Sequence, residues 1–200
     1  MSTALSQRRE MCGRLAAMPT ILGISGSARR NSYNAALLRL ISELAPEDCP
    51  VEMTSIQGIP LYDGDLEASE GIPPIVAALK DRVAAASGLL LVTPEYNNSV
   101  PGPFKNAIDW LSRPAADIPR VFGGHALALA GATPGPGGTR LAQTAWLPVL
   151  RVLGTCPFFG RNLSVANASK VFATDGRVID ENVRDQARQF IAAFAEFIRR

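Results

Sequence analysis

The feature that most constrains the fold is a repeated alternation between short apolar runs and longer amphipathic stretches. Apolar runs of strand length that alternate with helical patterns are typical of βαβ units, which place a parallel sheet between two layers of helices. Five such units follow one another from about residue 20. The pattern therefore predicts an α/β fold in the form of a three-layer α/β/α sandwich with a five-stranded parallel sheet.

The expected strands are short and apolar. The third is apolar almost throughout, as expected of a strand that helices cover on both faces. The five expected strands are Thr20 to Ile24, Val51 to Ile56, Leu89 to Thr93, Ala126 to Gly131 and one within Pro157 to Val165.

Amphipathic segments with a helical period separate these runs. Residues 58–71 are expected to form a loop, and Pro148 is expected to kink or break the fourth helix. The expected helices and their inward residues are one from about Ser32 (Leu37, Ile41, Leu44), one opened by Pro73 and Pro74 and stopped by Gly88 (Ile75, Leu79, Val83), one from Gly102 to Ser112, one ending near Leu153, and one capped by Asp180 (Val183, Phe190, Phe194, and Phe197 or Ile198).

The strand order decides where a ligand binds. Few right-handed, unknotted arrangements exist for five parallel strands, and a common one has the order 2-1-3-4-5. In that order the loops after strands one, three and four converge at one edge of the sheet, where ligands bind. In this sequence those three loops are also the ones with unusual composition.

The first of these loops, Ser25 to Asn34, has the composition of a site for a phosphate monoester. Such a group carries up to two negative charges, and a helix N-terminus supplies N–H groups and a favourable dipole. The bland alternative is a polar turn whose Ser32 only caps the next helix. Neither the P-loop motif nor G-x-G-x-x-G is present. The relevant side chains are Ser25, Ser27, Ser32 and Asn34 as hydrogen-bond donors, and Arg29 as a charge.

The loop after the third strand, Thr93 to Gly102, is stiffened by prolines and carries one aromatic residue, Tyr96. Backbone amides, an aromatic ring and the amide of Asn97 match the edge and face of a flat heterocycle. Alone, the segment could equally be a proline-stiffened turn that positions the next helix.

Three motifs together resemble the NAD(P)H-dependent FMN reductase family, which includes quinone, chromate and azo-dye reductases. The similarity covers about residues 20–200, and its long motif at 93–113 is highly specific. The resemblance implies a flavodoxin-like fold, in agreement with the order 2-1-3-4-5. The motifs are Gly-Ile-Ser-Gly-Ser-x-Arg-x-x-Ser-Tyr-Asn at 23–34, Thr-Pro-Glu-Tyr-Asn at 93–97, and Ser-Val-Pro-Gly-x-x-Lys-Asn-Ala-Ile-Asp-Trp-Leu-Ser-Arg at 99–113.

The resemblance also implies the site. It implies contacts to the FMN phosphate and to the flavin ring, completed by the backbone of the loop after strand four. Relatives often have serine in that last loop, whereas this chain has a Gly/Pro-rich segment at 133–138. The implied phosphate contacts are Ser27, Arg29, Ser32, Tyr33 and Asn34, and the implied ring contacts are Pro94, Glu95, Tyr96, Asn97 and Asn98, with Ala132 and Thr133 from the last loop.

The implied activity is the transfer of hydride from NADPH or NADH to FMN, and then of two electrons to a small acceptor such as a quinone, azo compound, chromate or flavin. No catalytic side chain is required, because the chemistry is on FMN. The resemblance further implies a homodimer or homotetramer.

Composition excludes several other classes. The net charge is +2 without a long basic run, so no nucleic-acid site is expected. Three separated cysteines and one histidine cannot form a Cys- or His-rich metal site, and no metal is expected. The unpaired cysteine count suits a reducing compartment. We therefore expect a cytoplasmic protein without membrane spans, with residues 1–18 as a flexible extension and residues 19–200 as a single domain.

Two other functions are considered beside the reductase. A non-enzymatic electron carrier of the flavodoxin type shares the fold, but such carriers are usually strongly acidic. A serine hydrolase would use Ser25 or Ser27 with His125 and Asp109, on an imperfect nucleophile elbow. On the third helix, Lys105, Asp109 and Arg113 are expected to form a surface ion-pair ladder, and Ile108 and Trp110 to lie in the core or a subunit contact.

Overall fold

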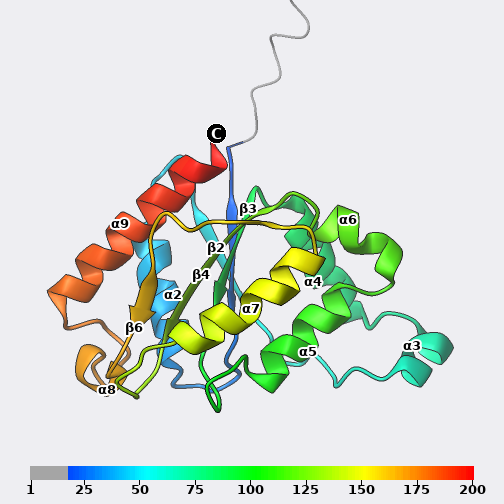
Figure 1. Cartoon of the computed structure of the whole chain (residues 1–200), viewed down its shortest axis with the longest axis horizontal. Coiled ribbons are helices and arrows are strands. Elements are labelled where there is room, and N and C mark those ends of the chain that lie inside the picture. Colours follow the sequence, from blue (N-terminus) through cyan, green and yellow to red (C-terminus); the bar gives the residue numbers. More distant parts are fainter. Residues whose placement is uncertain (1–17) are drawn as a thin grey trace, which may run out of the picture.

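The computed structural model describes residues 18–200, which form a parallel sheet between two layers of helices (Figure 1). All but the last residue of the expected extension, 1–18, lies outside the described residues. The sheet order is β2-β1-β3-β4-β5, and β6 also pairs with β4. This confirms the expected order. The strands are β1 (Ile21–Ser25), β2 (Val51–Ser55), β3 (Gly88–Val92), β4 (Ala126–Ala132), β5 (Cys156–Pro157) and β6 (Leu163–Val165).

The fifth strand position differs from the expectation because two short segments share it. Leu127 of β4 pairs with Pro157, and Ala130 pairs with Leu163. The Phe158 N–H still donates to the carbonyl oxygen of Leu127 at 2.7 Å, so residues 159–162 interrupt the ladder. The Cys156 N–H likewise donates to the carbonyl oxygen of His125, which precedes β4, so the missing N–H of Pro157 faces away from β4. The following Phe158 packs its ring against Phe194 and Phe197 at centroid distances of 5.5 and 5.4 Å.

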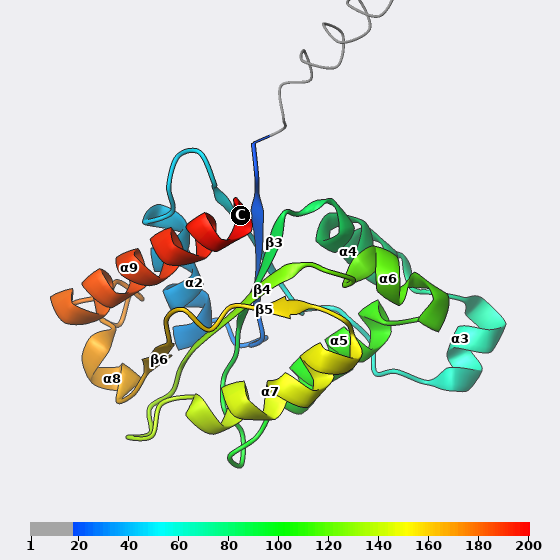
Figure 2. The same cartoon turned by 45° about the horizontal axis from the view of Figure 1, so that its top comes forward.

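The two helical layers follow from the alternation of side chains along each strand. Ile21 lies in the core between the sheet and one layer, and Leu22 lies in the core on the other face. Figure 2 shows the two layers on opposite sides of the sheet. One layer contains α2 (Tyr33–Glu43) and α9 (Glu181–Ile198), and the other contains α4 (Pro74–Ala85), α5 (Gly102–Leu111) and α7 (Arg140–Val152).

The remaining helices are short, and the expected loop at 58–71 contains one of them. Asp63 caps α3 by accepting the N–H groups of Asp65 and Leu66, yet none of its residues is buried. A helix without an apolar face leaves no periodic signal in the sequence. The short helices are α3 (Gly64–Glu70), the 3₁₀ turn η1 (Ala115–Asp117), α6 (Ile118–Val121) and α8 (Ala168–Val171).

Two details of the expected helices are wrong, and of the kink or break expected at Pro148 the break does not occur. Ile75 is 44% exposed, and its neighbour Val76 is the buried residue. Gly88 does not end α4 but opens β3, where a Cβ would lie 2.5 Å from Cδ1 of Ile198. Pro148 does not break α7, which continues through it to Val152.

The other inward residues of the final helix agree with the expectation. Val183, Phe190 and Phe194 are buried, and both Phe197 and Ile198 pack partly buried against the same core. Within residues 18–200, no helix combines the length and apolar character needed to cross a membrane.

A buried cation joins the helices of the second layer. The side chain of Lys80 on α4 is 4% exposed, and its Nζ donates to Oδ2 of Asp117 at 2.5 Å and to the carbonyl oxygen of Arg113. The hydrogen bond from Lys80 lowers the pKa of Asp117 below its ordinary value. Asp117 thereby compensates a charge that would otherwise be buried without a counter-ion.

We predict that Asp117→Asn lowers the free energy of unfolding at neutral pH. A carboxyl group with a lowered pKa in the folded protein stabilises it above its ordinary pKa of about 3.9, and this contribution is lost as the pH falls through the folded pKa. Wild type and variant should therefore converge in acid. Urea titrations at several pH values measure this. Asp185→Asn, which removes an exposed ion pair to Arg188, is the control. Equal stabilities of wild type and D117N at neutral pH would contradict the role of the Lys80–Asp117 pair.

Candidate functional site

The loop between β1 and α2 leaves the sheet at Gly26. The Gly26 N–H donates to the carbonyl oxygen of Val92 at 2.9 Å, which extends the β1–β3 pairing by one residue. A Cβ at this position would lie 2.0 Å from Cδ1 of Phe104. Only glycine therefore fits at the start of the loop between β1 and α2.

The serines of this loop organise its backbone. Ser32 caps α2, because its Oγ accepts the N–H groups of Asn34 and Ala35, both at 3.2 Å. Ser27 Oγ accepts the N–H of Arg29 at 3.4 Å. Both hydroxyls remain able to donate their own hydrogen. Within residues 18–200, the backbone N–H groups of Ala28, Arg30 and Asn31 have no protein acceptor, so the loop can offer them to an anion.

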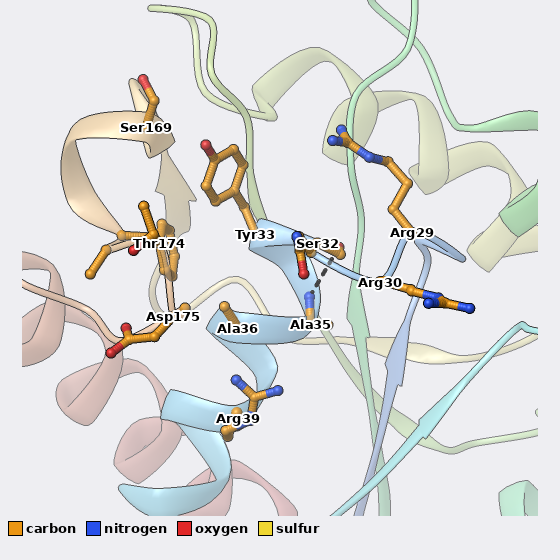
Figure 3. Close-up of a pocket in the computed structure, with 14 residues that line it drawn as sticks. Arg29, Arg30, Ser32, Tyr33, Ala35, Ala36, Arg39, Ser169, Thr174 and Asp175 are labelled. Carbon is orange, nitrogen blue, oxygen red and sulfur yellow. Dashed lines mark hydrogen bonds between the residues drawn. The ribbon is translucent and has the colours of Figure 1, made fainter.

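Arg29 adds positive charge at this helix end. It is exposed, and no carboxylate among residues 18–200 forms an ion pair with it. Figure 3 shows Arg29 on one side of Ser32 and the ring of Tyr33 on the other, near Ser169 and Thr174. The predicted phosphate residues thus surround the amino end of α2, with Tyr33 facing away from Arg29.

Asn34 has a structural role that the sequence did not reveal. It is 4% exposed, and its amide makes two hydrogen bonds to Ala132 at the end of β4. Nδ2 donates to the Ala132 carbonyl oxygen, and Oδ1 accepts the Ala132 N–H, both at 2.9 Å. The Asn34 side chain therefore joins the loop after β1 to the loop after β4. Its predicted contact to the phosphate stays a prediction.

Buried polar contacts hold the loop after β3 in place. Thr93 is fully buried, donates its hydroxyl to the carbonyl oxygen of Pro94 at 2.8 Å, and accepts the Nε1–H of Trp146 at 3.1 Å. Glu95 Oε2 accepts the N–H of Ala142 at 2.9 Å and so caps the start of α7. Glu95, predicted as a ring contact, thereby also ties this loop to the helix after β4.

The tip of the same loop is a two-residue hairpin. Tyr96 and Ser99 exchange both backbone hydrogen bonds, at 3.2 and 3.0 Å. Asn97 and Asn98 lie between them with φ of 49° and 59°. Positive φ at both positions is the requirement of a type I′ turn, which asparagine satisfies. Tyr96, Asn97 and Asn98 are exposed. The hairpin therefore presents these predicted ring contacts to solvent.

The loop after β4 packs tightly behind the other two. The Thr133 N–H donates to the Val165 carbonyl oxygen at 3.0 Å, which fixes the loop to β6. At Gly131 a Cβ would lie 2.2 Å from the Thr93 carbonyl oxygen, so the strands approach closely here. The loops after β1, β3 and β4 meet at one edge of the sheet, as the strand order predicted.

Two cavities flank the amino end of α2. One of about 380 Å³ is lined by Arg29, Ser32 and Tyr33, among others. A second, of about 340 Å³, is lined by Ser25, Ser27 and Arg29. The predicted residues of the loops after β3 and β4 line neither cavity. Four of the predicted phosphate contacts therefore border these hollows, namely Ser27, Arg29, Ser32 and Tyr33, whereas the predicted ring contacts Tyr96, Asn97 and Asn98 lie on an exposed surface.

The donor set fits a phosphate-bearing group. Ser25 is 3% exposed, and within residues 18–200 its buried Oγ has no hydrogen-bond partner. Free N–H groups, serine hydroxyls and an arginine without a counter-ion lie at a helix N-terminus, which favours an anion. The exposed hairpin and the loop after β4 lie at the same edge of the sheet as these groups, where a ring attached to the phosphate would lie.

The geometry rules out the hydrolase alternative. Ser25 and Ser27 lie at the carboxyl end of β1, whereas His125 precedes the amino end of β4, at the opposite edge of the parallel sheet. His125 Nε2 lies 3.1 Å from the carbonyl oxygen of Ala86. Asp109 pairs with Lys105 at 2.6 Å. These groups form no catalytic triad.

The expected ion-pair ladder on α5 is half correct. Lys105 pairs with Asp109, but Arg113 pairs with Glu67 of α3 at 2.8 Å. That pairing lowers the pKa of Glu67, and the hydrogen bond to Glu67 raises the pKa of Tyr62. Trp110 is fully buried and donates its Nε1–H to the Pro60 carbonyl oxygen. The motif at 99–113 thus includes the residues that fix the segment after β2.

Comparison with known proteins identifies the family. The model of the family described as NADPH-dependent FMN reductase matches residues 19–170, which is more than half of the chain. The chain belongs to this family. The resemblance drawn from the sequence motifs is confirmed.

Relatives of this FMN reductase match over nearly their whole length. The NAD(P)H-dependent FMN reductase of Pseudomonas aeruginosa is 39% identical over 90% of this chain and 95% of its own. The quinone reductase of Escherichia coli K12 is 37% identical, with 90% and 95% covered. The structure of FerB, a flavoenzyme NAD(P)H:(acceptor) oxidoreductase from Paracoccus denitrificans, has a TM-score of 0.80 at 33% identity and covers 90% of this chain and 97% of its own.

These findings confirm the flavodoxin-like fold and an NAD(P)H-dependent oxidoreductase with FMN as its cofactor. The three proteins above are named as reductases or as a flavoenzyme oxidoreductase, which favours an enzyme over the alternative of a non-enzymatic electron carrier.

We predict that Asn34→Ala destabilises the protein even without FMN. The change leaves the buried N–H and carbonyl oxygen of Ala132 without partners, which costs about 2–6 kcal/mol for the two groups together. Chemical denaturation of the FMN-free protein measures this loss.

Asn31→Ala is the matched control, because Asn31 is exposed in the same loop and its side chain forms no hydrogen bond within the described residues. If N34A kept wild-type stability without FMN and only lost affinity for FMN, Asn34 would be a phosphate ligand and the positioning role would be wrong.

Proposed function

We propose that this FMN reductase uses NAD(P)H to reduce quinones by two electrons at the edge of the sheet where the loops after β1, β3 and β4 meet. The observation that carries the proposal is the convergence of a donor-rich helix N-terminus with an exposed hairpin. Two relatives support the acceptor class: the E. coli quinone reductase and the 2-hydroxy-1,4-benzoquinone reductase of a Burkholderia species, the latter 34% identical over 88% of this chain.

The phosphate of FMN is assigned to the amino end of α2. Ser27 and Ser32 can donate their hydroxyl hydrogens, Arg29 supplies charge, and free N–H groups of the loop complete the donor set. Hydrogen bonds that involve a charged group are stronger than neutral ones, so several of them together can anchor the cofactor. Tyr33 borders this end from the side of α8, and Asn34 holds the loop against β4.

The ring is assigned to the space bordered by the hairpin and the loop after β4. Tyr96, Asn97 and Asn98 present a ring and amides there, and Pro94 and Glu95 support the hairpin. The backbone of Ala132 and Thr133 is assigned to the opposite side of the ring. When bound, FMN accepts hydride from the nicotinamide and supplies two electrons to the acceptor. Because the hairpin is exposed, donor and acceptor can use the same open face in turn, and no side chain is assigned an acid or base role.

We also propose that the enzyme is a cytoplasmic homodimer or homotetramer. Several large apolar side chains are exposed, among them Leu61, Val152 and Phe159, at 74–81%. A second copy of the chain would cover apolar surface of this kind. Cys49 and Cys156 are free thiols, which suits a reducing compartment.

The test is anaerobic reduction of the FMN-loaded protein. We expect about one equivalent of NADPH or NADH to bleach the oxidised flavin absorbance, because one hydride reduces one flavin. A benzoquinone added afterwards should restore the oxidised spectrum and appear as hydroquinone.

The control mixes the nucleotide and the quinone under the same conditions without protein, where no oxidation should occur. A flavin that stays oxidised with both nucleotides would refute the reductase proposal. A flavin that is reduced but is not reoxidised by the quinone would refute the acceptor class alone.

A further inference from the structure

The larger cavity beside α2 extends past the phosphate loop. One wall is α2, with Tyr33 and Arg39, and the other is the segment from α8 to the turn at residues 173–176. Arg39 reaches this turn, since its Nη1 lies 3.5 Å from the position that a Cβ would take on Gly176. The cavity holds about 380 Å³, so it can take a group larger than a water molecule.

The charges around this cavity are unbalanced. Arg29, Arg30 and Arg39 line it, and none forms an ion pair with a carboxylate of residues 18–200. Arg29 is assigned to the FMN phosphate, which leaves the charges of Arg30 and Arg39. Its one acidic residue, Asp175, is already paired with Arg177 at 2.6 Å, and this hydrogen bond lowers the pKa of Asp175. Arg113, by contrast, has its charge balanced by Glu67 at 2.8 Å. The cavity therefore has excess positive charge that an anion can neutralise.

The remaining lining suits a nucleoside rather than a bare ion. The ring of Tyr33 lies against Phe172 at a centroid distance of 5.5 Å and forms an aromatic wall. Figure 3 shows Ser169 and Thr174 on the same side as Tyr33, with Arg39 farther along α2. Aromatic faces, hydroxyls and arginines together match a base, a ribose and a phosphate.

We infer that this cavity binds the adenosine 2′-phosphate end of NADPH and that Arg39, assisted by Arg30, makes the enzyme prefer NADPH over NADH. The 2′-phosphate is the group that distinguishes NADPH from NADH. Its negative charge would neutralise the arginines, which have no carboxylate partner within residues 18–200. Arg29 lines both this cavity and its neighbour at the phosphate loop, so the nucleotide end would lie next to the flavin phosphate. The inference rests on the proposed function.

The test compares both nucleotides on FMN-loaded Arg39→Gln and Arg30→Gln. The ratio of KM for NADPH to KM for NADH should rise about tenfold or more in R39Q, and less in R30Q, because a charged hydrogen bond to the phosphate is lost. Calorimetric titration of the loaded enzyme with adenosine 2′,5′-bisphosphate should show tighter binding than AMP in wild type, and R39Q should remove that difference.

Arg151→Gln is the control, because Arg151 is exposed on α7, away from the cavity, and should leave the KM ratio unchanged. An unchanged ratio in R39Q, an equal rise of both KM values, or equal affinity of wild type for the bisphosphate and AMP would each overturn the inference. None of these results would contradict the reductase proposal. That proposal fails only if neither nucleotide reduces the flavin of the wild-type protein.

Discussion

The candidate site depends on the pair of buried hydrogen bonds between the Asn34 amide and the backbone of Ala132. Parallel strands bring the loops after β1 and β4 to one edge of the sheet, but β3 lies between these strands. A side chain must therefore bridge the gap, and Asn34 does so with a donor and an acceptor at 2.9 Å each. Both ends of the bridge are buried, so water cannot replace the hydrogen bonds that are lost when the bridge is broken. The amino end of α2 is thus held at a fixed place relative to the rest of the site.

Much of the fold was predictable from the period of the apolar residues and from the right-handedness of the connections between parallel strands. The apolar runs located β1 to β4 within one or two residues, and the rule of right-handed crossovers left few orders for five parallel strands. The failures have physical reasons. α3 has no buried face, so no period reveals it. β5 and β6 are separated because the Phe158 ring packs onto α9, a contact between residues more than thirty positions apart that local patterns do not encode.

The site was predictable in its chemistry but not in the division of its roles. Serines and an arginine before a helix indicated an anion, and the motif resemblance, which the family match confirms, supplied the ring-bearing cofactor. The side chains of two predicted contacts, Asn34 and Glu95, bond to the backbone of Ala132 and Ala142, which the sequence did not reveal. Both bonds join positions more than forty residues apart. Residue type alone gives the capacity to hydrogen-bond, and only the tertiary structure determines which partner uses it.

A crystal structure of the protein with FMN bound tests the central claim most directly. The account predicts the phosphate at the amino end of α2, within hydrogen-bond distance of Ser32 and Arg29, with the ring beside the hairpin of Tyr96 and the Asn34 amide still bonded to Ala132. A phosphate elsewhere, or an Asn34 side chain turned from Ala132 toward the phosphate, would contradict it.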